Sequence, residues 1–262
     1  MAHATQNDDQ KNVKGELEGK LHGVDGTDQR RHEASADSGP ETADGKADNF
    51  VTEGVYTPTE GKIIYTPEGK DIDITGMKPE HIADLGICRT FQNIRLFKSM
   101  SVLDNVKIAG NLRMKSGWLE NVVRSPRYNH ERQIIDEKAA KLLEEVGLSE
   151  QASDQSTSLP YGKQRRLEIA RALATDPKLL LLDEPAAGMN PQETQELMDF
   201  IRQIRDRYHL TIFLIEHHMD VVMGICERIY VLDHGNLIAN GVPAEIQSNK
   251  AVIEAYLGVD NA

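Results

Sequence analysis

The chain has 262 residues, of which 27% are charged and 39% hydrophobic, and its formal net charge is −12 at pH 7. This length fits one α/β domain with an inserted subdomain. The acidic balance argues against nucleic acid as a partner, because phosphate backbones are bound by clustered Lys and Arg. No run approaches the roughly 18 apolar residues of a membrane span, so we expect no direct insertion into a membrane.

The first 50 residues differ in composition from the rest of the chain. Their large apolar side chains are only Met1, Val13, Leu17, Leu21, Val24 and Phe50. So little apolar surface cannot offset the conformational entropy that folding costs. We therefore predict that residues 1–53 are disordered, with a short acidic helix around Glu16–Leu21 as the alternative. The segment also lacks the apolar stretch of a secretory signal.

A globular domain is predicted for residues 54–262. Gly61–Ile74 predicts two short strands around a Pro-Glu-Gly turn. Lys78–Gly86 predicts a short helix, with a proline early and a glycine after it. The sequence GICRTFQ, which ends at Gln92, predicts a strand that leads into a loop.

An inserted helical subdomain is predicted at about residues 93–158. Ser101 is a candidate N-cap for its first helix. Glu131–Leu148 has apolar residues at helical spacing, which predicts a second helix. The sequence SDQSTSLPYG then interrupts the helical pattern.

Strands and helices alternate in the remainder of the chain. Lys163–Pro177 predicts a helix that stops at Asp-Pro. KLLLLDE and LTIFLIEH predict buried strands on either side of the amphipathic helix PQETQELMDFIRQIRDRY. RIYVLDHGNLIANG predicts a hairpin, and PAEIQSNKAVIEAYLG predicts a terminal helix. This alternation favours an α/β fold with a mostly parallel sheet.

Four short motifs follow one another where strands end or a helix begins. Gln92 follows a strand, LPYGKQRRLEIARAL begins at Leu159, and His217 follows a later strand. Between them, Asp183 and Glu184 end an apolar strand. Each motif alone is compatible with a plain loop residue, helix cap or strand end. Their joint occurrence favours a functional site, because open α/β sheets bind ligands at the carboxyl ends of their strands.

Metal-binding patterns are weak in this sequence. Cys88 and Cys226 are far apart and lack metal-type spacing, so we interpret them as ordinary thiols in a reducing compartment. His217 and His218 are interpreted as a pair at a strand end, because no third ligand is evident nearby.

As a set, the motifs resemble the ABC-type ATPases, and more closely the ATP-binding subunits of branched-chain amino acid (LIV-type) uptake transporters. The closer resemblance rests on RTFQNIRLF, LPYGKQRRLEIARAL, DEPAAGMNP, IEHHMD and VIEAYLG, and it covers roughly Gly54 to Gly258. It implies an ABC-type P-loop NTPase core that uses ATP and Mg²⁺. It also implies a second ABC ATPase subunit and transmembrane permease subunits as partners, on the cytoplasmic face of the cell membrane.

The resemblance gives roles to single residues. Asp183 resembles the Walker B carboxylate that holds Mg²⁺, and Glu184 resembles the general base for attack on the γ-phosphate. Gln92 resembles the loop glutamine that reaches Mg²⁺ and the attacking water. His217 resembles the switch histidine that contacts the γ-phosphate.

Two more segments resemble parts that act across the interface of an ATPase dimer. The signature loop would present backbone N–H groups and a helix N-terminus to ATP held by the partner subunit. Its residues are Leu159, Pro160, Tyr161, Gly162, Lys163 and Gln164. The D-loop is matched by Ala186–Asn190, which includes Ala187, Gly188, Met189 and Asn190.

The P-loop pattern G-x-x-x-x-G-K-[ST], which cradles phosphates, does not occur in the 262 residues. The nearest candidate starts at Gly39, is one residue too long, and has Ala47 in place of the Mg²⁺-binding hydroxyl. We therefore expect a truncated ABC ATPase domain that is unable to hydrolyse ATP at its own site, with unpaired strand edges in its sheet. A genuine N-terminus, a wrong start site and a frameshifted gene are three possible origins.

Three functions remain open on this basis. The first is an ATPase subunit of an amino-acid importer. The second is a catalytically silent partner that donates its signature loop to an intact ATPase subunit. The third is a non-transport ABC ATPase of translation or repair, although those usually carry two ATPase cassettes in one chain.

Overall fold

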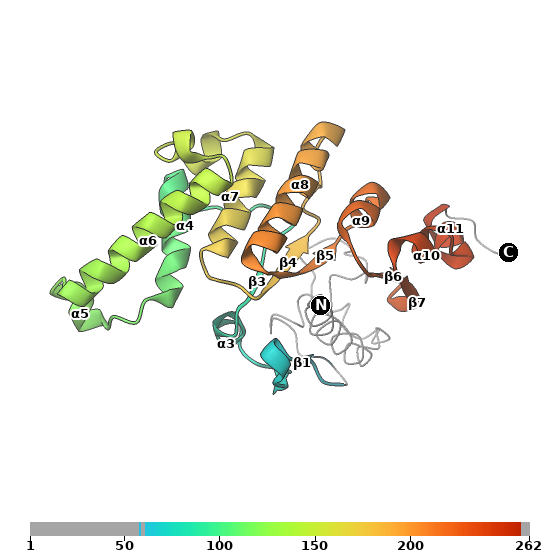
Figure 1. Ribbon diagram of the computed structural model, residues 1–262, viewed down its shortest axis with the longest axis horizontal. Coiled ribbons are helices and arrows are strands. Elements are labelled where there is room, and N and C mark those ends of the chain that lie inside the picture. The colour runs from blue at the N-terminus through green and yellow to red at the C-terminus, as the bar shows by residue number, and fades with distance from the viewer. Residues whose placement is uncertain (1–57, 59–60, 258–262) are drawn as a thin grey trace, which may run out of the picture. The chain divides into compact units, whose positions relative to one another are not determined.

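The computed structural model describes Pro58 and residues 61–257, which fall into two compact units (Figure 1). One unit contains residues 86–225. Of the described residues, the other contains Pro58, residues 61–85 and residues 226–257. The prediction of disorder for residues 1–53 lies outside the described residues.

The unit that contains residues 61–85 and 226–257 begins with a small hairpin and a short helix. β1 (Ile64–Tyr65) pairs antiparallel with β2 (Ile72–Asp73), and the 3-10 turn Pro67–Gly69 connects them. α3 (Pro79–Asp84) follows, with its proline in the first turn, where a missing N–H leaves no bond unmade. These elements confirm the predicted strands and short helix.

The same unit ends with a hairpin and two helices. β6 (Ile229–Asp233) pairs antiparallel with β7 (Asn236–Gly241), as the sequence predicts. The single terminal helix that we predicted is wrong, because the segment forms α10 (Pro243–Gln247) and α11 (Lys250–Leu257). Asn249 separates them: its side chain accepts the backbone N–H of the second residue of α11 and so starts a new helix.

The other unit is built on a parallel sheet. Its strands, in spatial order, are β3 (Ile87–Arg89), β4 (Leu179–Asp183) and β5 (Thr211–Ile215). β4 pairs in parallel with both neighbours, and every residue of β4 is buried. The parallel α/β arrangement that alternating helices and apolar strands predict is therefore confirmed.

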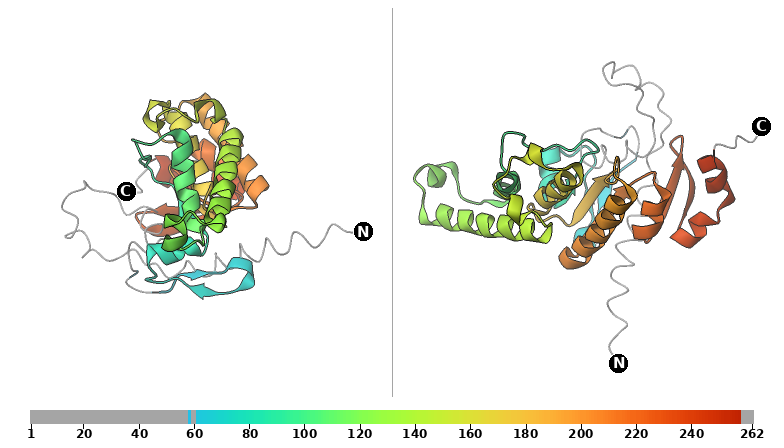
Figure 2. Two further views of the ribbon diagram at one scale, coloured as in Figure 1. Left: turned by 90° about the vertical axis from the view of Figure 1, so that its left-hand side faces the viewer. Right: turned by 90° about the horizontal axis from the view of Figure 1, so that it is seen from above.

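Helices occupy most of the chain between these strands, and one more helix follows β5. They are α4 (Val102–Gly110), α5 (Trp118–Val122), α6 (Pro126–Glu145), α7 (Tyr161–Leu173), α8 (Pro191–Tyr208) and α9 (Met219–Ile225), with 3-10 turns at Asn111–Arg113, Ser149–Gln151 and Ser156–Ser158. α4 packs against both α6 and α7 (Figure 2). The helical segment between β3 and α7 corresponds to the region predicted as a subdomain at about residues 93–158. No helix of the described chain combines the length and the apolar character that crossing a bilayer requires.

Local capping explains where two of these helices begin. Ser101 Oγ accepts the backbone N–H of Asp104, which confirms the predicted cap of α4. α6 begins five residues before the predicted start at Glu131, because Ser125 caps it and Pro126 occupies its first turn. The short helix α9 was not predicted.

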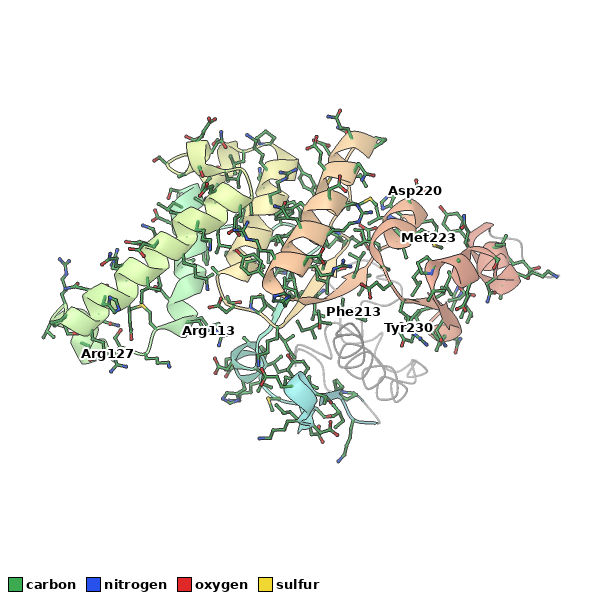
Figure 3. All side chains as sticks on the ribbon, viewed as in Figure 1. Arg113, Arg127, Phe213, Asp220, Met223 and Tyr230 are labelled. Carbon is green, nitrogen blue, oxygen red and sulfur yellow. The ribbon has the colours of Figure 1, made fainter. Side chains whose placement is uncertain are left out.

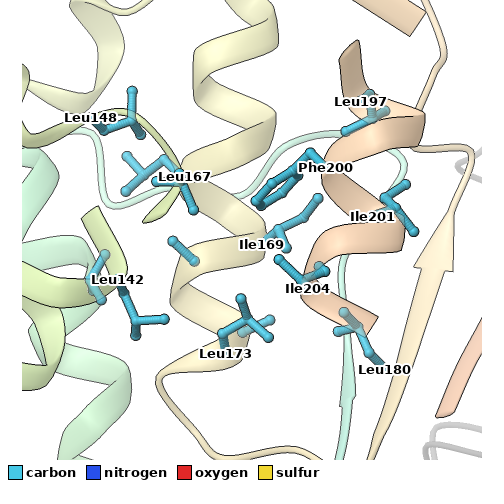
Figure 4. Close-up of a cluster of buried hydrophobic side chains, with 14 of the residues drawn as sticks. Leu142, Leu148, Leu167, Ile169, Leu173, Leu180, Leu197, Phe200, Ile201 and Ile204 are labelled. Carbon is cyan, nitrogen blue, oxygen red and sulfur yellow. The ribbon is translucent and has the colours of Figure 1, made fainter. Parts of the chain in front are cut away.

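The core of this unit lies between β4 and the helices α6, α7 and α8 (Figure 4). Leu167 and Ile169 of α7 and Leu180 of β4 are completely inaccessible to solvent. Burying an aliphatic side chain of this size contributes roughly 1.5–3 kcal/mol. This packing fixes α7 and β4, and with them the loops at which both begin or end.

Candidate functional site

Gln92, Glu184 and His217 come together where the three parallel strands end. Gln92 Nε2 donates a hydrogen bond of 2.5 Å to Glu184 Oε2. His217 Nδ1 lies 4.0 Å from Glu184 Oε1. The sequence predicts these residues at strand ends, and parallel pairing brings those ends to one edge of the sheet.

The backbone at Glu184 has an unusual conformation. Its φ angle is +41°, in the left-handed region that side chains with a Cβ rarely adopt. Its N–H donates to the carbonyl oxygen of Ile215 at 2.9 Å, which extends the β4–β5 ladder by one bond. Strained residues of this kind cluster at functional sites, where the surrounding structure holds them in place.

Asp183 forms a buried ion pair with Arg89. Arg89 Nη2 lies 2.6 Å from Asp183 Oδ2, and the two side chains are 2% and 3% exposed. The other carboxylate oxygen of Asp183 has no hydrogen-bond partner among the described residues. Sequence reasoning missed Arg89, although a charged residue inside the apolar run GICRTF signals a buried partner.

Glu216 connects the two histidines that follow it to the D-loop. Its side chain is fully buried and accepts the backbone N–H of Ala186 at 3.0 Å and that of His217 at 3.2 Å. Its Oε2 also lies 3.0 Å from His218 Nδ1. Sequence reasoning missed this carboxylate, which orients the loop that carries His217.

Glu216, His217 and His218 could together offer three metal ligands. The statement that no third ligand lies near the two histidines is therefore wrong, because Glu216 is adjacent to both. The carboxylate already accepts hydrogen bonds from backbone N–H groups and contacts His218. We assign no metal to this group.

The predicted signature loop forms the N-terminus of α7. The helix begins at Tyr161, which is 43% exposed, and its first intrahelical bond runs from the N–H of Gln164 to the carbonyl of Pro160. The N–H groups before Gln164 have no acceptor within the helix, as at any helix start. A Cβ added to Gly162 would meet only Glu193 Oε1, at 3.8 Å, so the approach to these N–H groups is open.

A cavity of about 270 Å³ lies beside this helix start. Its lining includes Pro160, Gly162 and Lys163 from the signature loop and Met189 from the D-loop. The two motifs that are predicted to act across a dimer interface thus share one surface of this unit. Leu159, at the start of the signature loop, packs inward: it is 5% exposed, and its carbonyl accepts the side-chain amide of Gln164 at 2.7 Å.

The D-loop leads from β4 into α8. Gly188 has a φ angle of +75°, and Asn190 is the N-cap of α8. Asn190 Oδ1 accepts the backbone N–H of Glu193, and the Glu193 carboxylate accepts the backbone N–H of Asn190. This reciprocal pair of hydrogen bonds is a capping box. Ala187 N–H donates to the carbonyl of Glu184, so the strained residue and the D-loop form one turn.

The described residues fit a divalent cation in part and fit phosphate poorly. Asp183 supplies an unpartnered carboxylate oxygen, and the next residue, Glu184, contacts Gln92; carboxylate and amide oxygens are the donors that Mg²⁺ prefers. The nearby guanidinium of Arg89 is already paired with Asp183, and the sequence contains no P-loop. We therefore derive no phosphate contact at this edge of the sheet.

The chain matches two family profiles and is similar to known transport proteins. The family profile described as "ABC transporter" matches residues 51–187, and the profile described as "Branched-chain amino acid ATP-binding cassette transporter" matches residues 236–262. The chain is 44% identical to the high-affinity branched-chain amino acid transport ATP-binding protein LivG of Escherichia coli K12. That match covers 78% of this chain and 79% of LivG.

Two further similarities agree with these matches. The high-affinity branched-chain amino acid transport ATP-binding protein BraF of Pseudomonas aeruginosa is 42% identical over 78% of this chain and 79% of its own length. The solved ADP conformation of MJ1267, an ATP-binding cassette of an ABC transporter, matches with a TM-score of 0.67 and 30% identity. That match covers 82% of this chain and 84% of MJ1267.

Proposed function

The chain belongs to the ABC transporter family, and we propose that it is an ATP-binding subunit of an importer for branched-chain amino acids. The names of LivG and BraF support this choice of solute class, as does the match of residues 236–262 to a branched-chain amino acid transporter profile. In this role, the chain works with a second ABC ATPase subunit and with transmembrane permease subunits. It then acts at the cytoplasmic face of the membrane, held there by the permease.

The single observation that carries the mechanism is the contrast between two loops. The signature loop presents N–H groups without an acceptor in the helix at the start of α7, with open space at Gly162. The sequence holds no P-loop to bind phosphates beside Glu184. We therefore assign this chain the role of completing the nucleotide site of its partner subunit, with little or no hydrolysis at its own site.

Each part of the signature loop has a defined task in this mechanism. The N-terminal N–H groups of α7 and the Lys163 side chain stabilise negative charge, because a helix N-terminus carries partial positive charge. Gly162 lets phosphate oxygens approach the backbone closely. Met189, at the same surface, contributes to the contact between subunits.

The residues at the strand ends support a second reading, the fully active ATPase subunit. Gln92 and His217 each lie within hydrogen-bond or ion-pair distance of Glu184. Asp183 and Gln92 would then hold Mg²⁺, which supplies charge stabilisation for phosphoryl transfer when bound. Glu184 would orient and deprotonate the attacking water, and His217 would contact the γ-phosphate.

Two substitutions separate these mechanisms in a complex reconstituted with the partner subunit and the permease. Gly162→Asp places a negative charge at the signature loop, so we expect ATP hydrolysis by the complex to fall at least a hundredfold. Gly162→Ala is the matched control, because a Cβ fits the open space there. Glu184→Gln should change hydrolysis less than twofold, and a large loss in this variant would overturn the silent-site mechanism.

Calorimetry with ATP and Mg²⁺ tests the same point on the purified chain. Without a phosphate cradle, the chain alone should show no measurable heat of ATP binding. Micromolar affinity would instead support the fully active subunit.

A further inference from the structure

Arg165, one turn into α7, is completely buried and directs its guanidinium at a loop far away in sequence. Nη1 donates to the carbonyl oxygen of Phe91 at 2.6 Å, and Nη2 donates to that of Gln92 at 2.8 Å. Nη1 also lies 2.7 Å from Glu168 Oε2. The planar fork of arginine suits such simultaneous contacts, which the single ammonium of lysine does not reproduce.

Glu168 holds the same loop through its backbone N–H groups. The residue is 1% exposed, and its Oε1 accepts the N–H of Arg95 at 3.2 Å and that of Phe91 at 3.4 Å. The loop between Thr90 and Leu96 contains no helix or strand that could pair these groups. Arg165 and Glu168 therefore supply hydrogen-bond partners for the backbone groups of this loop, which a helix or strand would pair within secondary structure.

Stability alone does not explain this buried pair. Replacing a buried ion pair with well-packed apolar residues is often neutral or stabilising, because desolvation offsets the attraction between the charges. Burial also lowers the pKa of the neighbouring Arg171, an effect that the Glu168 carboxylate opposes. The contacts of the pair with the backbone of Phe91, Gln92 and Arg95 point instead to a role in positioning residues 91–95.

We propose that Arg165 and Glu168 are positioning residues that lock residues 91–95 to the signature helix, so that Gln92 and Gly162 move as one body. Arg165 is three residues after Gly162, and its Nη2 lies 3.4 Å from the hydroxyl of Tyr161, the first residue of α7. A displacement of the Gln92 loop therefore displaces the start of α7. The consequence for catalysis rests on the proposed function, in which Gly162 contacts ATP held by the partner subunit.

Hydrogen–deuterium exchange of the purified full-length chain tests the lock without any need for ATP hydrolysis. Arg165→Lys keeps the charge and removes the fork, so we expect amide exchange in residues 91–95 to accelerate at least tenfold. Exchange in β4 should stay within twofold of the unsubstituted chain. The matched control is Arg166→Lys, because Arg166 is the next residue, is only partly buried and pairs with Glu196 at 3.4 Å; it should leave residues 91–95 unchanged.

Glu168→Gln provides a milder second variant. The amide oxygen of glutamine can still accept the N–H groups of the loop, so exchange there should rise less than in Arg165→Lys. The lock is overturned if residues 91–95 exchange at the original rate in both variants, or if exchange rises equally in β4, which indicates general destabilisation.

The reconstituted complex then tests the catalytic consequence. Arg165→Lys should lower the kcat of ATP hydrolysis at least fivefold, and Arg166→Lys should leave it within twofold. Faster exchange at residues 91–95 with an unchanged kcat overturns the catalytic consequence. Failure of the proposed function has a different signature, since Gly162→Asp would then leave hydrolysis unaffected.

Discussion

β4 and β5 are neighbouring strands of five residues with similar apolar sequences, and they occupy different environments. Every residue of LLLLD in β4 is buried, whereas Thr211 of β5 is exposed and the other residues of TIFLI are only partly buried. β4 lies between two strands, and β5 pairs only with β4 among the described residues. An apolar run therefore predicts membership of a sheet, while its neighbours decide how deeply it is buried.

The hydrogen bonds of β5 define its outer edge. Thr211 N–H donates to Lys178, and the carbonyl of Ile215 accepts from Glu184. Because backbone groups alternate in direction along a strand, the N–H and C=O groups of Ile212 and Leu214 point away from β4. Phe213, labelled on β5 in Figure 3, has its backbone groups directed at β4.

The largest loss of stability on substitution is expected at the end of β4, where Asp183 is buried against Arg89. Arg89→Leu removes the cation and leaves a carboxylate buried, so we expect a loss of about 3–5 kcal/mol in the free energy of unfolding. The partly exposed pair of Lys107 and Asp136 is the control, and Lys107→Leu should cost about 1 kcal/mol or less. Urea unfolding measures both, and equal losses would show that burial at Asp183 is incomplete.

A matched pair of leucines isolates the effect of burial on one face of the sheet. Leu182 of β4 and Leu214 of β5 are direct neighbours in the register, and Leu182 is 0% exposed. Leu182→Ala should cost about 2–5 kcal/mol, whereas Leu214→Ala should cost at least about 1 kcal/mol less because the site is partly solvated. The comparison uses urea midpoints at constant slope. Equal costs would mean that another segment covers β5.

The smallest effect requires no substitution and concerns single amides within β5. The N–H of Phe213 is directed at β4, whereas those of Ile212 and Leu214 face the outer edge. We expect exchange at Ile212 and Leu214 to be about tenfold faster, or about 1.4 kcal/mol less protected, than at Phe213. NMR-detected exchange resolves these amides. Equal protection of the three amides would mean that another strand pairs with the outer edge of β5.

Sequence patterns predict the elements of this protein better than the contacts between them. The helix α8 spans the predicted segment from Pro191 to Tyr208, because its N-cap, proline and amphipathic spacing all agree. The proximity of Gln92, Glu184 and His217 follows from parallel strand order. Arg89 and Glu216 escaped prediction, since the burial of a charge depends on partners that are distant in sequence or directed by the backbone.

The lock that Arg165 and Glu168 of α7 form on residues 91–95 was not predicted, for a related reason. Arg165 and Glu168 have the helical spacing of an ordinary surface ion pair, and helical periodicity alone does not reveal that this face meets a loop. Only the fold brings residues 91–95 onto α7. The sequence predicted Gln92 as a site residue and left open what holds its backbone in place.

The register of the sheet also bears on the order in which the chain folds. β4 and β5 join residues about 30 positions apart, whereas β3 and β4 join residues about 90 positions apart. Closing the longer loop costs about 1 kcal/mol more in chain entropy, because this cost grows with the logarithm of loop length. Early formation of α4, α6 and their mutual contact shortens the effective loop. The helical insertion therefore acts as a folding aid that draws β3 toward the strand pair already formed.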